Sequence, residues 1–281
     1  MFGKRILVTG ANGYIGTHVV KELLSQGKEV VACDVCLNDV DNGATLLETD
    51  IFSRDNDIYE LAGKPDTLIH LAWRNGFKHN LESHIEDLPL HIKFLTKMVN
   101  SGIKSLSVMG SMHEVGYFEG AIKADTPTNP LSLYGIAKNA LRQYLEILTR
   151  NSDVAFHWLR GFYIYGDDTK SSSVLGKIIE AEKNGQEFFP FTSGKNLCDF
   201  ISVKQLAKQI VAATLQKEYV GIINCCSGKP ISLGEVAENF IKQNNYKIKL
   251  KYGAFPERAY DSPAVWGDAE IIDKIISAKE K

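Results

Sequence analysis

Two residues four positions apart, Tyr134 and Lys138, are suited to proton transfer. They occur in SLYGIAKNALRQYLEIL, where apolar residues recur at helical spacing, so both side chains lie on one face of a helix. A free tyrosine titrates near about 10, too high for exchange at neutral pH without nearby positive charge. We expect Lys138 to lower the phenol pKa so that Tyr134 exchanges a proton with a carbinol oxygen. The alternative is a tyrosine beside a solvated lysine, because this spacing is common by chance.

The segment GSMHEVGY, residues 110–117, follows the apolar run KSLSVM and is rich in polar groups. Ser111 stands at the end of that predicted strand, 23 residues before Tyr134. Ligands of open α/β sheets bind at the carboxyl ends of the strands, so we predict that Ser111 hydrogen-bonds the substrate oxygen that Tyr134 protonates. His113 and Glu114 are further candidates to face the substrate, although a loop histidine is equally often a solvated surface group.

The segment TGANGYIG, between a predicted strand and a predicted helix, contains three glycines: Gly10, Gly13 and Gly16. Glycines there allow a tight turn, close approach of a pyrophosphate and close helix packing, and the helix N-terminus attracts phosphate. Asp34 ends the next strand, EVVACD, where a carboxylate accepts hydrogen bonds from ribose hydroxyls. The pattern predicts a bound dinucleotide, although Asp34 is alternatively a simple turn residue.

The cofactor is predicted to be NAD(H) rather than NADP(H). The Asp34 carboxylate would repel a 2′-phosphate, and Val35 and Cys36, which follow it, supply no arginine to hold one. Asp50 and Ile51 close the third predicted strand and are weaker candidates to flank the adenine. An oxidised nicotinamide would add positive charge near Tyr134.

The elements that must position these groups alternate between strand and helix. Short apolar strands without polar alternation, separated by helices, predict an α/β fold with a Rossmann-type doubly wound parallel sheet. The expected strands are 5–9, 29–33, 45–49, 67–72, 105–109, 154–160 and 221–225, with helices at 14–25, 55–61, 81–100, from 131, 173–184, from 203 and from 233. We expect residues 1–165 to form the dinucleotide-binding domain, with segments near 197–226 returning to it, and 166–281 to form mainly a small substrate-binding cap. A strand pair is expected around EFFPF and LCDFIS, and a further strand at KIKLKY.

Composition excludes several classes of protein. With 32 Lys and Arg against 34 Asp and Glu, the chain has no basic field for nucleic acid. It has no apolar run long enough for a membrane helix, and its start reads as a strand rather than a signal peptide, so we expect a cytoplasmic protein. The five cysteines suit a reducing compartment, and the single CxxC of Cys33 and Cys36 has no partner motif, so no metal is expected.

Several motifs in order make the chain resemble an extended short-chain dehydrogenase/reductase of the NAD-dependent epimerase/dehydratase family, which acts on nucleotide-activated sugars. They are TGANGYIG, HLA at 70–72, GSMHEVG, YGIAK, LRGFYIYG, CDFISV and INCCSG. The resemblance implies that Ser111, Tyr134 and Lys138 are catalytic and that Lys138 also touches the nicotinamide ribose. It also implies cofactor contacts from Asn12, Tyr14, Ile15, Leu71 and Ala72.

Departures from the family pattern narrow the activity. Dehydratases usually carry an acidic pair after the serine, where this chain has Met112 and His113. Arg258 is the best candidate to clamp a substrate diphosphate, against a surface arginine as alternative. We favour a reductase similar to those acting on dTDP-4-keto-6-deoxyhexoses, with a UDP- or dTDP-sugar 4-epimerase as second choice and a cofactor-sensing binding protein as third. A homodimer through the helices near 81–100 and 132–150 is what the family would lead us to expect.

Overall fold

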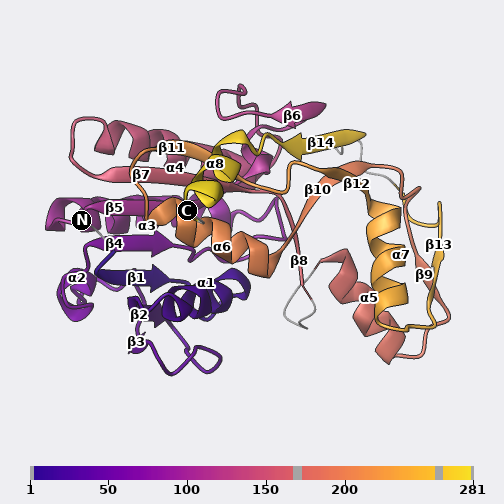
Figure 1. The fold of residues 1–281 in the computed structure, drawn as a ribbon, viewed down its shortest axis with the longest axis horizontal. Coiled ribbons are helices and arrows are strands. Elements are labelled where there is room, and N and C mark those ends of the chain that lie inside the picture. Colours follow the sequence, from indigo (N-terminus) through magenta and orange to yellow (C-terminus); the bar gives the residue numbers. More distant parts are fainter. Residues whose placement is uncertain (1–2, 167–172, 257–261, 280–281) are drawn as a thin grey trace.

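A parallel sheet forms the body of the molecule in the computed structural model, which describes residues 3–166, 173–256 and 262–279. Its strands are β1 (Arg5–Thr9), β2 (Glu29–Asp34), β3 (Thr45–Glu48), β4 (Thr67–His70), β5 (Ser105–Ser111), β7 (Ala155–Gly161) and β11 (Gly221–Cys225). They lie in the order β11-β7-β5-β4-β1-β2-β3 (Figure 1), and all neighbours are parallel. The strand order reverses between β1 and β4, which creates the crevice where doubly wound sheets bind ligands. The predicted fold class is confirmed.

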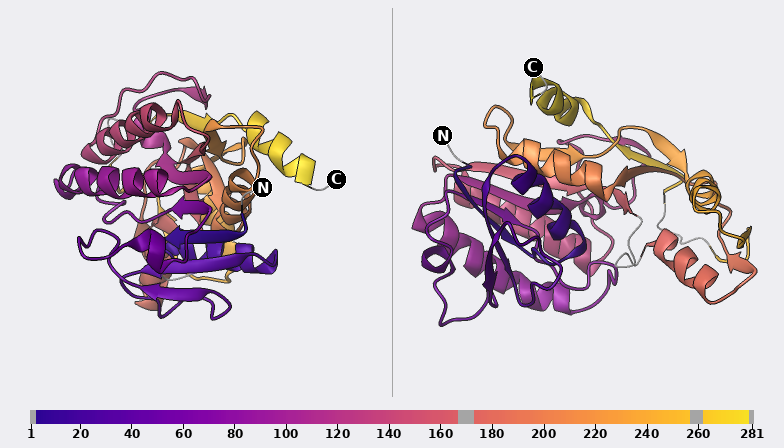
Figure 2. Two further views of the ribbon diagram at one scale, coloured as in Figure 1. Left: turned by 90° about the vertical axis from the view of Figure 1, so that its left-hand side faces the viewer. Right: turned by 60° about the horizontal axis from the view of Figure 1, so that its bottom comes forward.

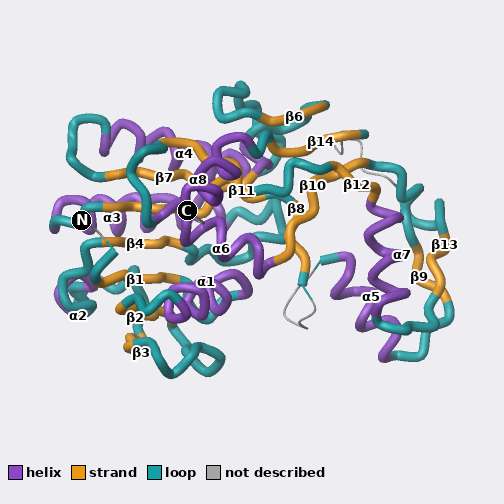
Figure 3. The backbone as a smooth tube through the Cα atoms, in the orientation of Figure 1, coloured by secondary structure: helices purple, strands orange, loops and turns teal. Residues whose placement is uncertain are grey.

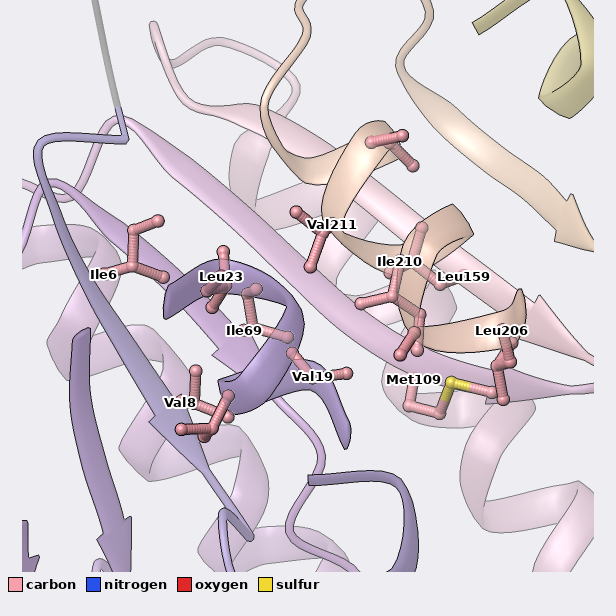
Figure 4. Packing of buried hydrophobic residues seen from close by; sticks show 14 of the residues in the cluster. Ile6, Val8, Val19, Leu23, Ile69, Met109, Leu159, Leu206, Ile210 and Val211 are labelled. Carbon is pink, nitrogen blue, oxygen red and sulfur yellow. The ribbon is translucent and has the colours of Figure 1, made fainter. Parts of the chain in front are cut away.

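Helices cover both faces of this sheet (Figure 2). One face carries α1 (Tyr14–Ser25), α6 (Val203–Thr214) and α8 (Glu270–Lys279); the other carries α2 (Ile58–Leu61), α3 (Ser83–Ser101) and α4 (Leu133–Thr149). Within β1, Ile6 and Val8 point to the first layer and Leu7 to the second. The inner strands are therefore buried on both faces, which explains their uninterrupted apolar runs, whereas the edge strand β3 is mostly exposed. Figure 4 shows the first layer, where side chains of α1 and α6 pack on the sheet.

Serine residues start several helices. Ser132, Ser202 and Ser232 each precede a helix and accept a hydrogen bond from the backbone N–H three residues later, which satisfies one of the unpaired donors of the first turn. This local signal explains why these helix starts were predictable. No helix in the described ranges is both long and apolar enough to cross a bilayer.

A second, mixed sheet lies beyond the C-terminal ends of the main strands. It contains β12 (Pro230–Ser232), β10 (Leu197–Ser202), β14 (Ala264–Gly267) and β6 (Gly120–Ile122) in that order, and β8 (Tyr163–Tyr165) also pairs with β10. Four of these five strands were not predicted, because strands of three or four residues leave little periodicity to detect. The helix α8 was not predicted either.

A small lobe extends from this second sheet and contains α5 (Val174–Lys183), α7 (Leu233–Gln243), β9 (Phe188–Pro190) and β13 (Lys249–Lys251). Figures 1 and 3 show this lobe set apart from the main sheet. The expected pairing of EFFPF with LCDFIS is wrong: β9 pairs with β13 and β10 with β8, β12 and β14. β9 and β10 follow each other in sequence but do not pair, because segments from later in the chain (β13 for β9, β12 and β14 for β10) provide their partners.

Candidate active site

Ser111, Tyr134 and Lys138, the three predicted catalytic residues, lie together at the C-terminal edge of the sheet. Ser111 is the last residue of β5, and the other two occupy the first turns of α4. The Ser111 hydroxyl is hydrogen-bonded to the phenol of Tyr134. The Lys138 ammonium nitrogen is 5.9 Å from the Tyr134 ring centroid and donates to the Met109 carbonyl at 2.8 Å. A strand end and a helix start thus bring two hydroxyls and a lysine into one crevice.

The expectation that Lys138 lowers the pKa of the Tyr134 phenol was wrong. Burial raises the pKa of its phenol to about 12, and the hydrogen bond from Ser111 opposes this only in part. Part of the Tyr134 surface still reaches solvent. Burial also lowers the pKa of Lys138 to about 7, so the lysine is only partly charged at neutral pH. Desolvation outweighs the cation on which the prediction relied.

Glu114, one of the two candidates to face the substrate in this loop, points into the protein instead. Its side chain is completely buried, and its carboxylate accepts the Ser111 N–H at 2.6 Å and the Trp158 indole N–H at 2.9 Å. Arg160 lies 3.8 Å away, and burial raises the pKa of Glu114 while this arginine opposes the rise. Glu114 closes a capping box on the short 3₁₀ turn Met112–Glu114, so its position fixes Ser111.

A small cavity is lined by residues that contact Tyr134. His113 lines it, as do His79 and Asn80 from the loop after β4 and Tyr163 from β8. The His79 carbonyl accepts the Tyr134 N–H at 2.9 Å, and the two rings stack with centroids 5.4 Å apart. Sequence reasoning missed His79. Its signal was a cluster of aromatic and imidazole side chains, WRNGFKH, directly after a strand that ends at the ligand-binding edge.

The glycine turn between β1 and α1 forms a tight cradle. Gly10 has φ of +72°, and a Cβ there would lie 2.5 Å from the Ala72 nitrogen and 2.8 Å from the Leu71 carbonyl carbon. A Cβ on Gly16 would lie 2.1 Å from the Gly10 carbonyl oxygen. Gly13, the residue before α1, offers no side chain to cap the helix. The first-turn N–H groups therefore remain suited to the oxygens of a diphosphate.

Other predicted cofactor residues surround this turn. Asp34 lies at the end of β2, and its carboxylate accepts the Asn12 N–H at 3.0 Å and the Val35 N–H at 2.8 Å. The hydroxyl of Tyr14 approaches Gly166 after β8, and Ile15 packs on the apolar layer around α1.

Asp50 and Ile51 follow β3 farther along the same edge. The Asp50 carboxylate accepts the Phe52 N–H at 2.9 Å, and Ile51 packs on the apolar layer around α3 and α4. Arg258 lies outside the described residues. Within the described ranges, no group of three or more His, Cys, Asp or Glu residues is arranged to hold a metal ion.

Comparisons with known proteins agree with this architecture. A family model described as the NAD-dependent epimerase/dehydratase family matches residues 6–226. The chain is 48% identical over 270 residues to a protein of Aggregatibacter actinomycetemcomitans named dTDP-6-deoxy-L-talose 4-dehydrogenase (NAD(+)), covering 93% of this chain and 98% of that one.

Two solved structures share the fold. One is a UDP-N-acetylglucosamine 4-epimerase from Methanobrevibacter ruminantium in complex with UDP-N-acetylmuramic acid, with a TM-score of 0.81, 24% identity and coverage of 98% and 92%. The other is a UDP-glucuronic acid 4-epimerase from Bacillus cereus in complex with UDP-glucuronic acid and NAD, with a TM-score of 0.82, 19% identity and coverage of 97% and 93%. Since the family model spans most of the chain and the dehydrogenase matches nearly all of it, this protein belongs to the NAD-dependent epimerase/dehydratase family.

Proposed function

We propose that the protein is an NADH-dependent reductase of a dTDP-linked 4-keto-6-deoxyhexose. The observation that carries the proposal is the meeting of Ser111, Tyr134 and Lys138 at the C-terminal edge of the sheet, the edge at which the glycine turn follows β1. The substrate class follows from the 48% identity to a dTDP-6-deoxy-L-talose 4-dehydrogenase, whose name describes the oxidation of a sugar alcohol at C4. Hydride transfer is reversible, and reduction of the 4-keto sugar is the same reaction in the opposite direction.

The protonation state of Tyr134 supports reduction. With a pKa raised to about 12, the phenol carries its proton at neutral pH, as a general acid must. Ser111 donates a hydrogen bond to the carbonyl oxygen and polarises it. Tyr134 then delivers its proton to that oxygen while the carbonyl carbon is reduced, and an alcohol results. The phenolate regains a proton from solvent.

The residues around the glycine turn fit the cofactor. In our proposal the N-terminus of α1 holds the diphosphate, Asp34 accepts from the adenosine ribose, and Asn12, Tyr14, Ile15, Asp50, Ile51, Leu71 and Ala72 complete the walls. Lys138 contacts the nicotinamide ribose. When bound, NADH supplies the hydride for the carbonyl carbon. The Asp34 carboxylate disfavours the 2′-phosphate of NADPH.

The deciding experiment follows NADH absorbance with a dTDP-4-keto-6-deoxyhexose and separates the sugar products by chromatography. We expect stoichiometric loss of NADH with formation of the 4-hydroxy sugar. If the protein instead interconverts UDP-sugars without net change in absorbance, the reductase proposal fails and the 4-epimerase is favoured. The 4-epimerase is the second candidate because the same serine, tyrosine and lysine would serve oxidation and re-reduction at C4 in one pocket.

Two further proposals concern partners. The cap formed mainly by 166–281 would bind the nucleotide, with Arg258 at the diphosphate.

A homodimer would form through α3 and α4, where a groove is lined by Ile85, Leu88 and Tyr144, and where Ile147 is 67% exposed. Sedimentation of the wild type and of Ile147→Glu would test this: we expect a dimer that the charge dissociates.

The compartment is a separate proposal. The five cysteines are all free thiols, and burial raises the pKa of Cys33 to about 12, so its thiol is unreactive. Buried free thiols suit the cytoplasm, where we place the protein.

A further inference from the structure

Trp73 lies directly against the buried lysine of the site. The Lys138 ammonium nitrogen is 3.8 Å from the centroid of the indole ring, well inside the distance at which a cation is attracted to the face of an aromatic ring. Trp73 follows Leu71 and Ala72 of the proposed cofactor cradle, so the contact is made at the ligand-binding edge of the sheet.

The indole ring is held in place by residues of α3. Its N–H donates to Nδ1 of His84 at 3.1 Å, and Nε2 of His84 is 3.0 Å from the Lys78 carbonyl. The carbonyl can only accept, so Nε2 carries the proton and Nδ1 is free to accept from the indole. The His91 ring stacks on Trp73 with centroids 4.4 Å apart and an interplanar angle of 17°. These contacts position the indole independently of Lys138.

The other groups around Lys138 act on its charge in different directions. Desolvation disfavours the ammonium and lowers its pKa to about 7, whereas Glu114 favours it. His70 and His91 lie close enough for the lysine charge to lower their pKa values, which burial already depresses, so both imidazoles are neutral at pH 7 and add no repulsion. Tyr134 is neutral as well.

Two groups touch the ammonium and can offset its desolvation. They are the Met109 carbonyl, which accepts its hydrogen bond, and the face of Trp73. Both favour the cation, because a hydrogen bond from an ammonium is stronger than one from a neutral amine and the aromatic face attracts positive charge. The indole therefore adds to the charge preference that the carbonyl already provides.

We propose that Trp73 is a positioning residue that keeps Lys138 in its charged form at this buried site. The contact holds the ammonium beside the cradle formed by the glycine turn and the end of β4. Only the consequence for catalysis rests on the proposed function; the contact and its dependence on charge do not.

A double-mutant cycle tests the charge dependence without any assay of activity. Trp73→Leu, Lys138→Met and the double variant are unfolded with urea at pH 6, where the lysine is mostly charged, and at pH 10, where it is neutral. We expect the two side chains to be coupled by about 3- to 30-fold in the folding equilibrium at pH 6, and much less at pH 10. Equal coupling at both pH values would mean plain packing and would overturn the proposal.

Matched variants separate the effect of the aromatic face of Trp73 from the effect of its side-chain size. Trp73→Phe keeps a weaker aromatic face and should retain part of the coupling at pH 6, which also covers the case in which Trp73→Leu does not fold. Trp266→Leu, on β14 of the second sheet, makes the same substitution at another partly exposed tryptophan and should show no pH-dependent coupling to Lys138. If Trp73→Phe behaves like the leucine variant at both pH values, the aromatic face is not the cause and the inference fails.

Kinetics supply the second readout. If charged Lys138 is needed for turnover, kcat/KM falls as pH rises through the lysine pKa, and Trp73→Leu should move this fall to lower pH by about half a unit to one unit. A fall that stays at the wild-type pH in a folded Trp73→Leu enzyme would contradict the inference. If the protein does not reduce the keto sugar at all, the proposed function fails, but the unfolding cycle still decides the role of Trp73.

Discussion

The backbone N–H of Asn12 donates to the Asp34 carboxylate over 3.0 Å, which ties the glycine turn to the end of β2. One carboxylate therefore shapes the turn and is available to a ribose hydroxyl. Any change at Asp34 has to be judged for both tasks.

Asp34→Asn should weaken the preference for NADH over NADPH. The amide oxygen can still accept the Asn12 N–H, so the turn is retained, but the charge that binds ribose hydroxyls and repels a 2′-phosphate is lost. Hydrogen bonds to charged groups contribute about 1.5–3 kcal/mol, so the KM for NADH should rise about 10- to 100-fold, measured in the reductase assay. Asp41→Asn, whose exposed side chain accepts the Gly43 N–H, is the control and should leave both KM values unchanged.

Tyr134→Phe should lower kcat by about 10²- to 10⁴-fold, because the general acid is removed, while substrate KM changes little. Ser111→Ala should cost about 10²- to 10³-fold through loss of one polarising donor. Steady-state rates measure both effects.

The control for these variants is Tyr117→Phe, which removes an exposed hydroxyl and should leave kcat unchanged. A Tyr134→Phe enzyme near the wild-type rate would remove the tyrosine from the chemistry and reopen the possibility of a binding protein.

Lys138→Met should stabilise the protein at neutral pH while abolishing turnover. The lysine pKa falls from 10.5 to about 7 on folding, so the unfolded chain binds more protons between these values. Stability contributed by this group therefore rises with pH from 7 to 10.5 and is lowest below 7. We expect the free energy of unfolding at pH 7 to increase by about 2–4 kcal/mol in urea titrations.

The same titrations repeated up to pH 10.5 provide the control. The wild type should gain stability across this window relative to Lys138→Met, so the two curves converge. A constant difference between them would show that the lysine is not the titrating group.

Asp199→Ala should destabilise the junction between the two sheets. This fully buried carboxylate accepts the N–H groups of Ser227, Gly228 and Gly267 at 2.7, 2.9 and 3.1 Å, which come from the turn after β11 and from β14. Removing it leaves buried donors without an acceptor, at a cost of about 3–5 kcal/mol, measured by urea unfolding. Asp199→Asn keeps one acceptor and should cost less; equal losses for both variants would argue against hydrogen bonding as the cause.

The sequence by itself determined the main sheet, the glycine turn and the identity of the central residues. Apolar runs such as residues 5–9 and serine caps such as Ser132 are local signals. The order of strands and helices then carried the C-terminal ends of β1 and β5 to one edge, so the approach of Ser111 to Tyr134 could be anticipated.

Only the tertiary structure decided what depends on burial and on contacts between distant segments. The direction of Glu114, the partners of β9 and β10, and the contact of Trp73 with Lys138 all arise where segments far apart in the chain meet. The pKa values of Tyr134 and Lys138 were misjudged for the same reason: spacing in a helix reveals which charges are neighbours, whereas the cost of removing them from water is set by the surrounding fold.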